Sequence, residues 1–238
     1  MPTNTVILIT GGSSGIGMTT ALLFAEKGAD IVITYRNNKQ GADDVVDKIT
    51  NKGRKTLAVQ ADLMNESDAK KVVDETMKMF GRIDVLVNNA GGYIEGDEWD
   101  GDPAIWIQSL QQNLVSVMMM SKYVTKVFQK QGHGIIVNVA SVHAVSGRFD
   151  AISYGAAKAG VVNVTQSYAT LLSEFGGRAN SVSPSATNVG YWLTASNEEL
   201  TEQLTQSPLI EPQMIAEKIM FLASDEAKGI NGQNFVIE

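Results

Sequence analysis

Residues 5–17, TVILITGGSSGIG, place a short apolar run directly before a glycine-rich turn. The run at 5–10 is β-branched and stops after a few residues, which predicts a strand rather than a signal peptide. Gly11, Gly15 and Gly17 then open the pattern of a helix. Glycines at such a turn let the backbone approach a ligand, and free N–H groups at a helix start hold a pyrophosphate. The turn alone is a weak signal, but its place between a first strand and a helix favours dinucleotide binding.

Apolar runs of the same kind recur along the chain, and longer helical patterns separate them. The predicted strands span residues 5–10, 30–35, 55–60, 83–89, 134–141, 178–183 and 233–238. The predicted helices span residues 15–27, 39–51, 66–80, 104–130, 153–174 and 213–223. Strands that are apolar on both faces and alternate with helices form a parallel sheet with right-handed crossovers. The sequence therefore predicts an α/β fold with a doubly wound, Rossmann-type sheet of seven parallel strands, helices on both faces, and one domain over residues 1–238.

Composition narrows the classes of partner. The chain has 238 residues, of which 44% are hydrophobic, so one substantial core is expected. A net charge of −7 argues against a nucleic-acid or anionic membrane surface, and no segment is long enough to span a bilayer. The chain has no cysteine and two histidines, so neither a disulfide framework nor a metal site is expected. We expect a cytoplasmic protein with a small-molecule partner.

Polar residues follow several predicted strands, at the edge where open α/β sheets bind ligands. Tyr35 and Arg36 follow the second strand, where NAD-selective sheets usually carry an acid. A guanidinium there suits a 2′-phosphate, although a solvated surface arginine is the alternative interpretation. Asp62 follows the third strand, either as a ligand contact or as a cap of the next helix. Asn88 to Gly92 follow the fourth strand, as part of the site or as a simple turn.

Three further polar residues complete this edge of the sheet. Ser141 follows the fifth strand, and Tyr154 and Lys158 lie four positions apart within SYGAAKAG. Positions i and i+4 share one face of a helix, so both polar heads can act on one point in space. Taken separately, Ser141 can be an ordinary turn or cap residue, and Tyr154 and Lys158 can be a solvated pair on a helix surface. Because these residues are predicted to project into one crevice, a catalytic role is favoured over a purely structural one.

With these motifs the chain resembles a short-chain dehydrogenase/reductase of the single-domain subfamily over nearly its whole length. The resemblance implies a catalytic tetrad made of Asn113, Ser141, Tyr154 and Lys158. It implies that the cofactor contacts Gly11, Ser13, Ser14, Gly15, Ile16, Gly17, Tyr35, Arg36, Asp62, Leu63, Asn89, Ala90, Gly91, Tyr154, Lys158, Pro184, Ser185 and Thr187. It also implies a homotetramer built on the helices that follow Ala104 and Ser153.

The chemistry of carbonyl reduction assigns roles to these residues. Tyr154 supplies the proton, or as a phenolate removes it when an alcohol is oxidised, and Lys158 supplies a positive charge one turn away. The resemblance adds that Lys158 holds the nicotinamide ribose, that Asn113 positions a water and that Ser141 bonds the substrate oxygen. Where the family usually has Pro-Gly, this chain has Pro184-Ser185. The aperiodic stretch 185–212 is predicted to be a substrate lid.

The leading interpretation is an NADP(H)-dependent reductase of ketones or aldehydes, reversible in direction, with NAD(H) left open as a second cofactor. The alternative is a 3-oxoacyl-(acyl carrier protein) reductase, for which Lys122, Lys126 and Lys130 are candidate docking cations. The acidic stretch 198–211 and the acidic net charge disfavour that alternative. A regulator without catalysis conflicts with the complete tetrad. A hydrolase using Ser141 lacks a nucleophile elbow and a histidine base.

Overall fold

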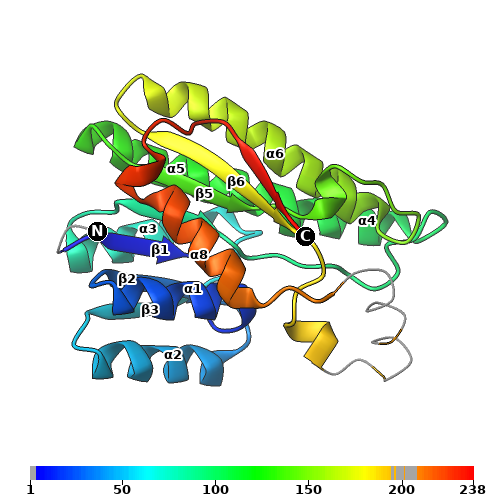
Figure 1. The fold of residues 1–238 in the computed structure, drawn as a ribbon, viewed down its shortest axis with the longest axis horizontal. Helices are drawn as coiled ribbons and strands as arrows, with labels where there is room; N and C mark the ends of the chain where they lie inside the picture. The colour runs from blue at the N-terminus through cyan, green and yellow to red at the C-terminus, as the bar shows by residue number, and fades with distance from the viewer. Residues whose placement is uncertain (1–3, 194–195, 197–200, 202–207) are drawn as a thin grey trace.

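The computed structural model describes residues 4–193, 196, 201 and 208–238. Within these residues, parallel strands form one seven-stranded sheet in the order β3-β2-β1-β4-β5-β6-β7 (Figure 1). The strands are β1 (Val6–Ile9), β2 (Asp30–Tyr35), β3 (Thr56–Gln60), β4 (Val85–Asn88), β5 (Ile135–Val139), β6 (Arg178–Pro184) and β7 (Asn234–Ile237). The doubly wound parallel sheet predicted from the alternating pattern is confirmed.

Helices cover both faces of the sheet. In the described part of the chain, the helices are α1 (Gly15–Glu26), α2 (Lys39–Asn51), α3 (Glu66–Phe80), α4 (Pro103–Leu110), α5 (Ser116–Gln131), α6 (Ile152–Ser173) and α8 (Pro212–Ala223). Shorter helical turns are η1 (Gln111–Val115), η2 (Val142–Ala144), η3 (Gly190–Leu193) and η4 (Asp225–Ala227). One face packs against α1, α2 and α8, and the other against α3, α5 and α6 (Figure 1).

The central strand β1 shows why the sequences of the strands are apolar at consecutive positions. Ile7 and Ile9 pack on the face that holds Phe24 of α1, whereas Leu8 packs on the opposite face with Phe128 of α5. Successive side chains of a strand point to opposite faces, and here both faces are covered. Removing either buried phenylalanine side chain would cost about 3–5 kcal/mol, so each face holds its own helices firmly on the sheet.

The predicted helix at 104–130 differs from the structure in one respect. It consists of α4, then η1, then α5, and the five residues of η1 are hydrogen-bonded as a π-helix. Asn113 lies in this segment, and its side-chain Nδ2 donates to the carbonyl of Ser109 at 3.0 Å. Wide turns of this kind often mark functional sites. Apolar periodicity indicates the helix but carries no signal for the local widening.

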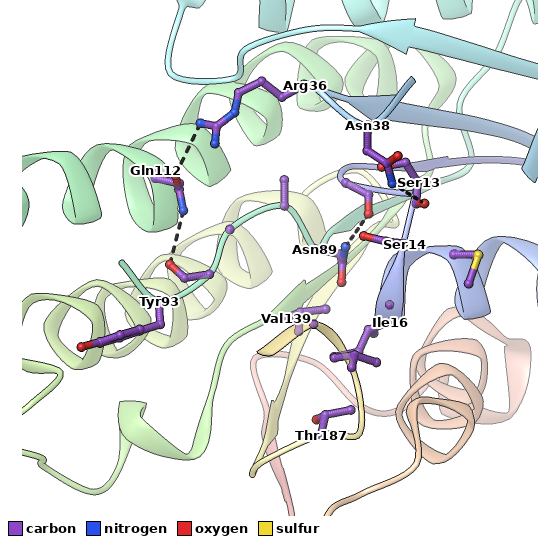
Figure 2. A pocket seen from close by; sticks show the side chains of 18 of the residues that line it. Ser13, Ser14, Ile16, Arg36, Asn38, Asn89, Tyr93, Gln112, Val139 and Thr187 are labelled. Carbon is purple, nitrogen blue, oxygen red and sulfur yellow. Dashed lines mark hydrogen bonds between the residues drawn. The ribbon is translucent and has the colours of Figure 1, made fainter. Parts of the chain in front are cut away.

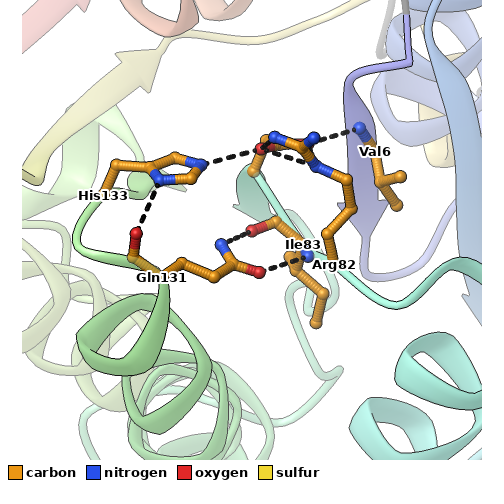
Figure 3. A network of polar contacts seen from close by, with 6 residues as sticks. Val6, Arg82, Ile83, Gln131 and His133 are labelled. Carbon is orange, nitrogen blue, oxygen red and sulfur yellow. Dashed lines mark hydrogen bonds and ion pairs between the residues drawn. The ribbon is translucent and has the colours of Figure 1, made fainter.

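A polar network ties together the amino-terminal ends of the strands (Figure 3). Asp84, which is 9% exposed, accepts a hydrogen bond from the backbone N–H of Val6 at 2.8 Å. Its carboxylate also pairs with the Arg82 guanidinium at 2.6 Å and contacts His133 Nε2 at 3.0 Å. One carboxylate therefore joins the start of β1, the start of β4 and the segment that leads into β5.

Candidate active site

The turn between β1 and α1 has the geometry of an anion cradle. Gly11 and Gly15 have φ angles of +67° and +53°, a region that other residues rarely adopt. Ser14 is the N-cap of α1, but its side chain makes no cap hydrogen bond. The first N–H groups of a helix have no intrahelical partner, and the helix dipole makes this end positive. The turn can therefore bind phosphate groups through backbone N–H groups.

Thr10 and Asn89 fasten this turn to the end of β4. The Thr10 hydroxyl accepts from the backbone N–H groups of Asn89 and Ala90 at 3.0 and 2.9 Å. In return, Asn89 Nδ2 donates to the carbonyls of Thr10 and Gly11 at 2.9 and 3.1 Å. A Cβ atom on Gly17 would lie 2.3 Å from the Gly11 carbonyl oxygen. Gly17 therefore allows α1 to pack closely on the turn and does not itself line the cleft.

The ends of β2 and β3 form the next part of the site (Figure 2). Arg36 Nη1 donates to Gln112 Oε1 at 3.5 Å, and Gln112 Nε2 donates to the Gly92 carbonyl at 3.3 Å. Asp62 accepts from the backbone N–H of Met64 at 3.1 Å, so it closes a local turn and does not cap α3. Both Arg36 and Asp62 line the cleft. The arginine therefore lines the same cleft as the turn between β1 and α1.

The carboxyl end of β5 and the first turns of α6 bring three predicted catalytic residues together: Ser141, Tyr154 and Lys158. Lys158 is 3% exposed, and its Nζ donates to the carbonyl of Val139 at 2.9 Å. The same Nζ lies 5.6 Å from the centre of the Tyr154 ring. Ser141 is buried, and its Oγ accepts from the backbone N–H of His143 at 3.2 Å. The cluster predicted from the Tyr-x-x-x-Lys spacing and the strand-end serine is therefore formed.

Burial sets the acid–base properties of this cluster. It lowers the pKa of Lys158 to about 8, because an ammonium group loses its hydration in the protein interior. Burial also raises the pKa of the Tyr154 phenol, and the neighbouring Ser141 hydroxyl opposes that rise. At pH 7 Lys158 is thus largely protonated and Tyr154 holds its proton. This is the starting state that proton donation requires.

Asn113 lies behind the cleft and not on its wall. Its side chain is fully buried, with Nδ2 donating to the Gly92 carbonyl at 3.0 Å and Oδ1 accepting from the Gly92 N–H at 2.8 Å. It therefore braces the loop after β4 and holds the η1 segment against it. The predicted role of Asn113 in positioning a water is not tested by these contacts and stays a prediction.

The serine at the position of the usual glycine is accommodated after β6. Ser185 Oγ is buried and has no hydrogen-bond partner, whereas the backbone N–H of Ser185 donates to Ile237 at 2.9 Å. Thr187 Oγ1 donates to the Ser185 carbonyl at 3.0 Å, and Thr187 forms a bridge with Ile210. A buried hydroxyl without a partner is uncommon and marks an available contact for a ligand. Residues 194–195, 197–200 and 202–207 of the predicted lid lie outside the described residues.

Most of the predicted site residues line one cleft of about 990 Å³. Those that line it are Gly11, Ser13, Ser14, Gly15, Ile16, Tyr35, Arg36, Asp62, Leu63, Asn89, Ala90, Gly91, Ser141, Tyr154, Lys158, Pro184, Ser185 and Thr187. Gly17 and Asn113 do not line it. The roles of all these residues toward a ligand stay predictions. The volume of the cleft, the uncapped start of α1 and the unpartnered Ser185 hydroxyl fit a dinucleotide.

Sequence reasoning missed three residues that shape the cleft. Asn38 Nδ2 donates to the Ser13 carbonyl at 3.2 Å (Figure 2). Thr34 Oγ1 accepts from the Gly11 N–H at 3.1 Å. Gln112 connects Arg36 to the loop after β4. Asn38 is the N-cap of α2, three residues after the end of β2, so its position is a usable signal. Gln112 comes from a helix, and only the folded chain brings it to the cleft.

His143 does not form a catalytic base for Ser141. Burial and then Arg148 lower the pKa of His143, and its Nδ1 is buried without a hydrogen-bond partner. Its ring meets the Tyr154 ring edge-on, with ring centres 6.2 Å apart. In the part of the chain that the structure describes, the hydrolase interpretation therefore finds no imidazole nitrogen bonded to the serine.

The described residues hold no cluster of three or more metal-ligating side chains. None of the helices described is both long and apolar enough to cross a membrane.

Comparisons with known proteins agree with this architecture. The family model described as "Enoyl-(Acyl carrier protein) reductase" matches residues 11–238. A 3-oxoacyl-(acyl-carrier-protein) reductase of Synechocystis sp. is 35% identical, over 98% of this chain and 95% of that protein. A cis-4-hydroxycyclohexanecarboxylate dehydrogenase of Sinomonas cyclohexanicum is 34% identical, over 98% of this chain and 94% of that protein.

Solved structures give the same picture. Levodione reductase superposes with a TM-score of 0.93 at 29% identity, over 100% of this chain and 97% of that one. An actinorhodin polyketide ketoreductase with NADPH superposes with a TM-score of 0.91 at 25% identity, over 98% of this chain and 95% of that one. Fold, cleft and relatives together define an oxidoreductase. The chain belongs to the short-chain dehydrogenase/reductase family.

Proposed function

We propose that this protein is an NADP(H)-dependent reductase that converts a ketone or aldehyde to an alcohol, reversibly, with Tyr154 as the acid and base. The observation that carries the proposal is the gathering of Ser141, Tyr154 and Lys158 in the cleft that also contains the β1–α1 phosphate cradle. We propose that this cleft lies within a single domain and serves both cofactor and substrate.

The residues of this chain divide the chemical work. A bound nicotinamide cofactor would supply the hydride, held by Ser13 to Gly15 and by Lys158. The Ser141 hydroxyl donates a hydrogen bond to the substrate oxygen, where negative charge develops. The Tyr154 phenol donates its proton to the same oxygen. The Lys158 ammonium, 5.6 Å from the centre of the phenol ring, stabilises the phenolate that remains.

The preference for NADP(H) over NAD(H) rests on Arg36. This residue lines the cleft after β2, at a place where the sequence has no acid to bond a ribose hydroxyl. The actinorhodin ketoreductase, which was solved with NADPH, supports the same choice of cofactor.

The test of the proposal combines a substrate panel with a single substitution. A set of free ketones and aldehydes is assayed by NADPH absorbance with the wild type and with Tyr154→Phe. The phenylalanine variant is expected to lose at least about 100-fold in kcat, because a positioned proton donor is removed. Its Kd for NADPH is expected to stay unchanged. A variant that kept more than about a tenth of wild-type kcat would refute the acid role.

A second candidate function is the reduction of 3-oxoacyl groups on an acyl carrier protein, which relatives of this chain are named for. The net charge of −7 opposes the docking of an acidic carrier. Of the candidate docking cations, Lys122 already pairs with Glu66 at 2.7 Å. We therefore favour free carbonyl compounds. A far higher kcat/KM for a carrier-bound 3-oxoacyl group than for the free ketone would reverse this choice.

We also propose a homotetramer and a cytoplasmic location. Exposed apolar side chains on α4, α5 and α6 support the assembly, since such groups often mark contact surfaces. These are Ile107, Met118 and Leu171, which are 58%, 45% and 41% exposed. Light scattering in solution checks the mass of the assembly, and a monomer would refute the proposal.

A further inference from the structure

The first turn of α6 has no cap of its own. The N-cap residue is Ala151, which has no side-chain oxygen to accept a hydrogen bond. The leading N–H groups of any helix lack intrahelical partners and need acceptors from elsewhere. Tyr154 lies in this first turn. Whatever holds these N–H groups therefore also holds the backbone of the tyrosine.

Asp97 supplies the missing acceptors from the loop between β4 and α4. Its Oδ1 accepts from the backbone N–H of Ser153 at 2.9 Å and from the Ser153 hydroxyl at 2.5 Å. Its Oδ2 accepts from the backbone N–H of Tyr154 at 2.7 Å. The backbone carbonyl of Asp97 accepts from the N–H of Ile152 at 3.2 Å. One residue thus bonds three consecutive N–H groups at the start of the helix.

Burial separates Asp97 from the other acids of its loop. Asp97 is 0% exposed, whereas Glu95, Glu98 and Asp100 are exposed to solvent. A buried carboxylate is costly unless hydrogen bonds and a favourable field compensate it. The positive end of a helix supplies that field, and charged acceptors make strong hydrogen bonds there. The side chain is therefore held in a built pocket at the start of α6.

We infer that Asp97 is a positioning residue for Tyr154, which fixes the first turn of α6 so that the phenol stays beside Ser141 and Lys158. The inference rests on the proposed function, because the position of the phenol matters only if Tyr154 is the acid. Misplacement of a reacting group by about 1 Å can cost on the order of 100-fold in rate. Loss of this long-range cap therefore acts on turnover and leaves the cofactor cradle at β1 intact.

The test compares Asp97→Ala and Asp97→Asn with the control Asp100→Asn, which removes an exposed acid from the same loop. We expect kcat to fall about 100-fold in the alanine variant and about 10-fold in the asparagine variant, which keeps one acceptor oxygen. The Kd for NADPH is expected to stay within about twofold of wild type in both, because Asp97 does not line the cleft. Amide exchange at Ser153 and Tyr154 is expected to accelerate, and the control is expected to match wild type.

Three results would overturn the inference: wild-type kcat in Asp97→Ala, equal losses in Asp100→Asn, or a Kd for NADPH that weakens in step with kcat. If Asp97→Ala does not fold, Asp97→Asn and Ser153→Ala carry the same test, and full activity in both would overturn it. Tyr154→Phe is measured alongside. An active Tyr154→Phe refutes the proposed function, whereas an inactive one beside a fully active Asp97→Ala refutes only the positioning role.

Discussion

Lys158, which we propose to act in catalysis, also carries a cost in stability. The side chain is 3% exposed, and burial brings its pKa from 10.5 to about 8. Because each pKa unit corresponds to about 1.4 kcal/mol, a protonated Lys158 destabilises the fold by about 3 kcal/mol at neutral pH. A side chain without the ammonium group would leave the Val139 carbonyl without this donor, at a cost of about 1 kcal/mol. A site that holds a buried charged side chain is expected to lower the stability of the fold while supporting activity.

The first prediction concerns Lys158→Met in the cofactor-free protein. At pH 7 the variant is expected to be inactive and more stable by about 2 kcal/mol, because the cost of burying the charge is removed. Between pH 8 and 10 the unfolded chain binds more protons at Lys158 than the native one, so wild-type stability rises with pH. The difference in unfolding free energy between variant and wild type should therefore become smaller as the pH rises from 8 to 10. Urea unfolding at several pH values measures this difference in free energy. A difference that stayed constant with pH would contradict the lowered pKa of Lys158.

The second prediction concerns the choice of cofactor at Arg36. Arg36→Ala is expected to weaken NADPH binding by about 10-fold or more while changing NADH binding little, because the proposed partner of the guanidinium is the 2′-phosphate, which NADH lacks. Fluorescence titration with each cofactor gives both dissociation constants. Lys48→Ala is the control, since it removes an exposed cation of α2 that does not line the cleft. Equal weakening of both cofactors would show that Arg36 does not bind the phosphate.

At the scale of elements, the turn between β1 and α1 depends on close packing around Gly17. A Cβ atom there would lie 2.3 Å from the Gly11 carbonyl and 2.5 Å from Asn89 Nδ2. Gly17→Ala is therefore expected to displace the turn, weaken NADPH binding and destabilise the protein by about 1–3 kcal/mol. Gly229→Ala is the control, because its added Cβ meets nothing within 4 Å. Calorimetry and cofactor titration measure both effects, and equal behaviour of the two variants would refute the packing argument.

The elements also show where sequence reasoning ends. The helices and strands follow from apolar periodicity, which is a local property, and the structure confirms them. The π segment at Asn113 and the cap at Asp97 are different, because both depend on contacts with residues distant in the chain. Asp97 reads as one of several acids in a polar loop, and nothing local distinguishes it from Asp100. Its burial against α6 appears only when the loop and the helix are placed together.

At the scale of the whole molecule, the two edges of the sheet differ in character. The carboxyl edge carries the cleft, and the amino edge carries the network around Asp84. The alternation of strands and helices made the convergence of Ser141, Tyr154 and the glycine-rich turn predictable, because parallel strands end at one edge. The Asp84 network was not predicted, since no rule brings Arg82 and His133 to one carboxylate.

The separation of the two edges leads to a prediction about Asp84→Ala. This change removes a partly buried ion pair and leaves the Val6 N–H without its carboxylate acceptor, so a loss of about 2–4 kcal/mol in unfolding free energy is expected. The kcat at a temperature where the variant is folded is expected to stay at the wild-type value. Asp74→Ala is the control: its pair with Lys70 is exposed and worth less than about 1 kcal/mol. A large fall in kcat for Asp84→Ala would contradict the separation.

The strand order also governs how the chain assembles during its synthesis. β1 pairs with β2, its neighbour in the chain, but its other partner is β4, which begins at Val85 beyond two further strand–helix units. At roughly 5–20 residues per second, the ribosome leaves that side of β1 without a partner for several seconds. An open, apolar strand edge can pair with other chains. Nascent chains that stop before β4 are therefore expected to be prone to aggregation.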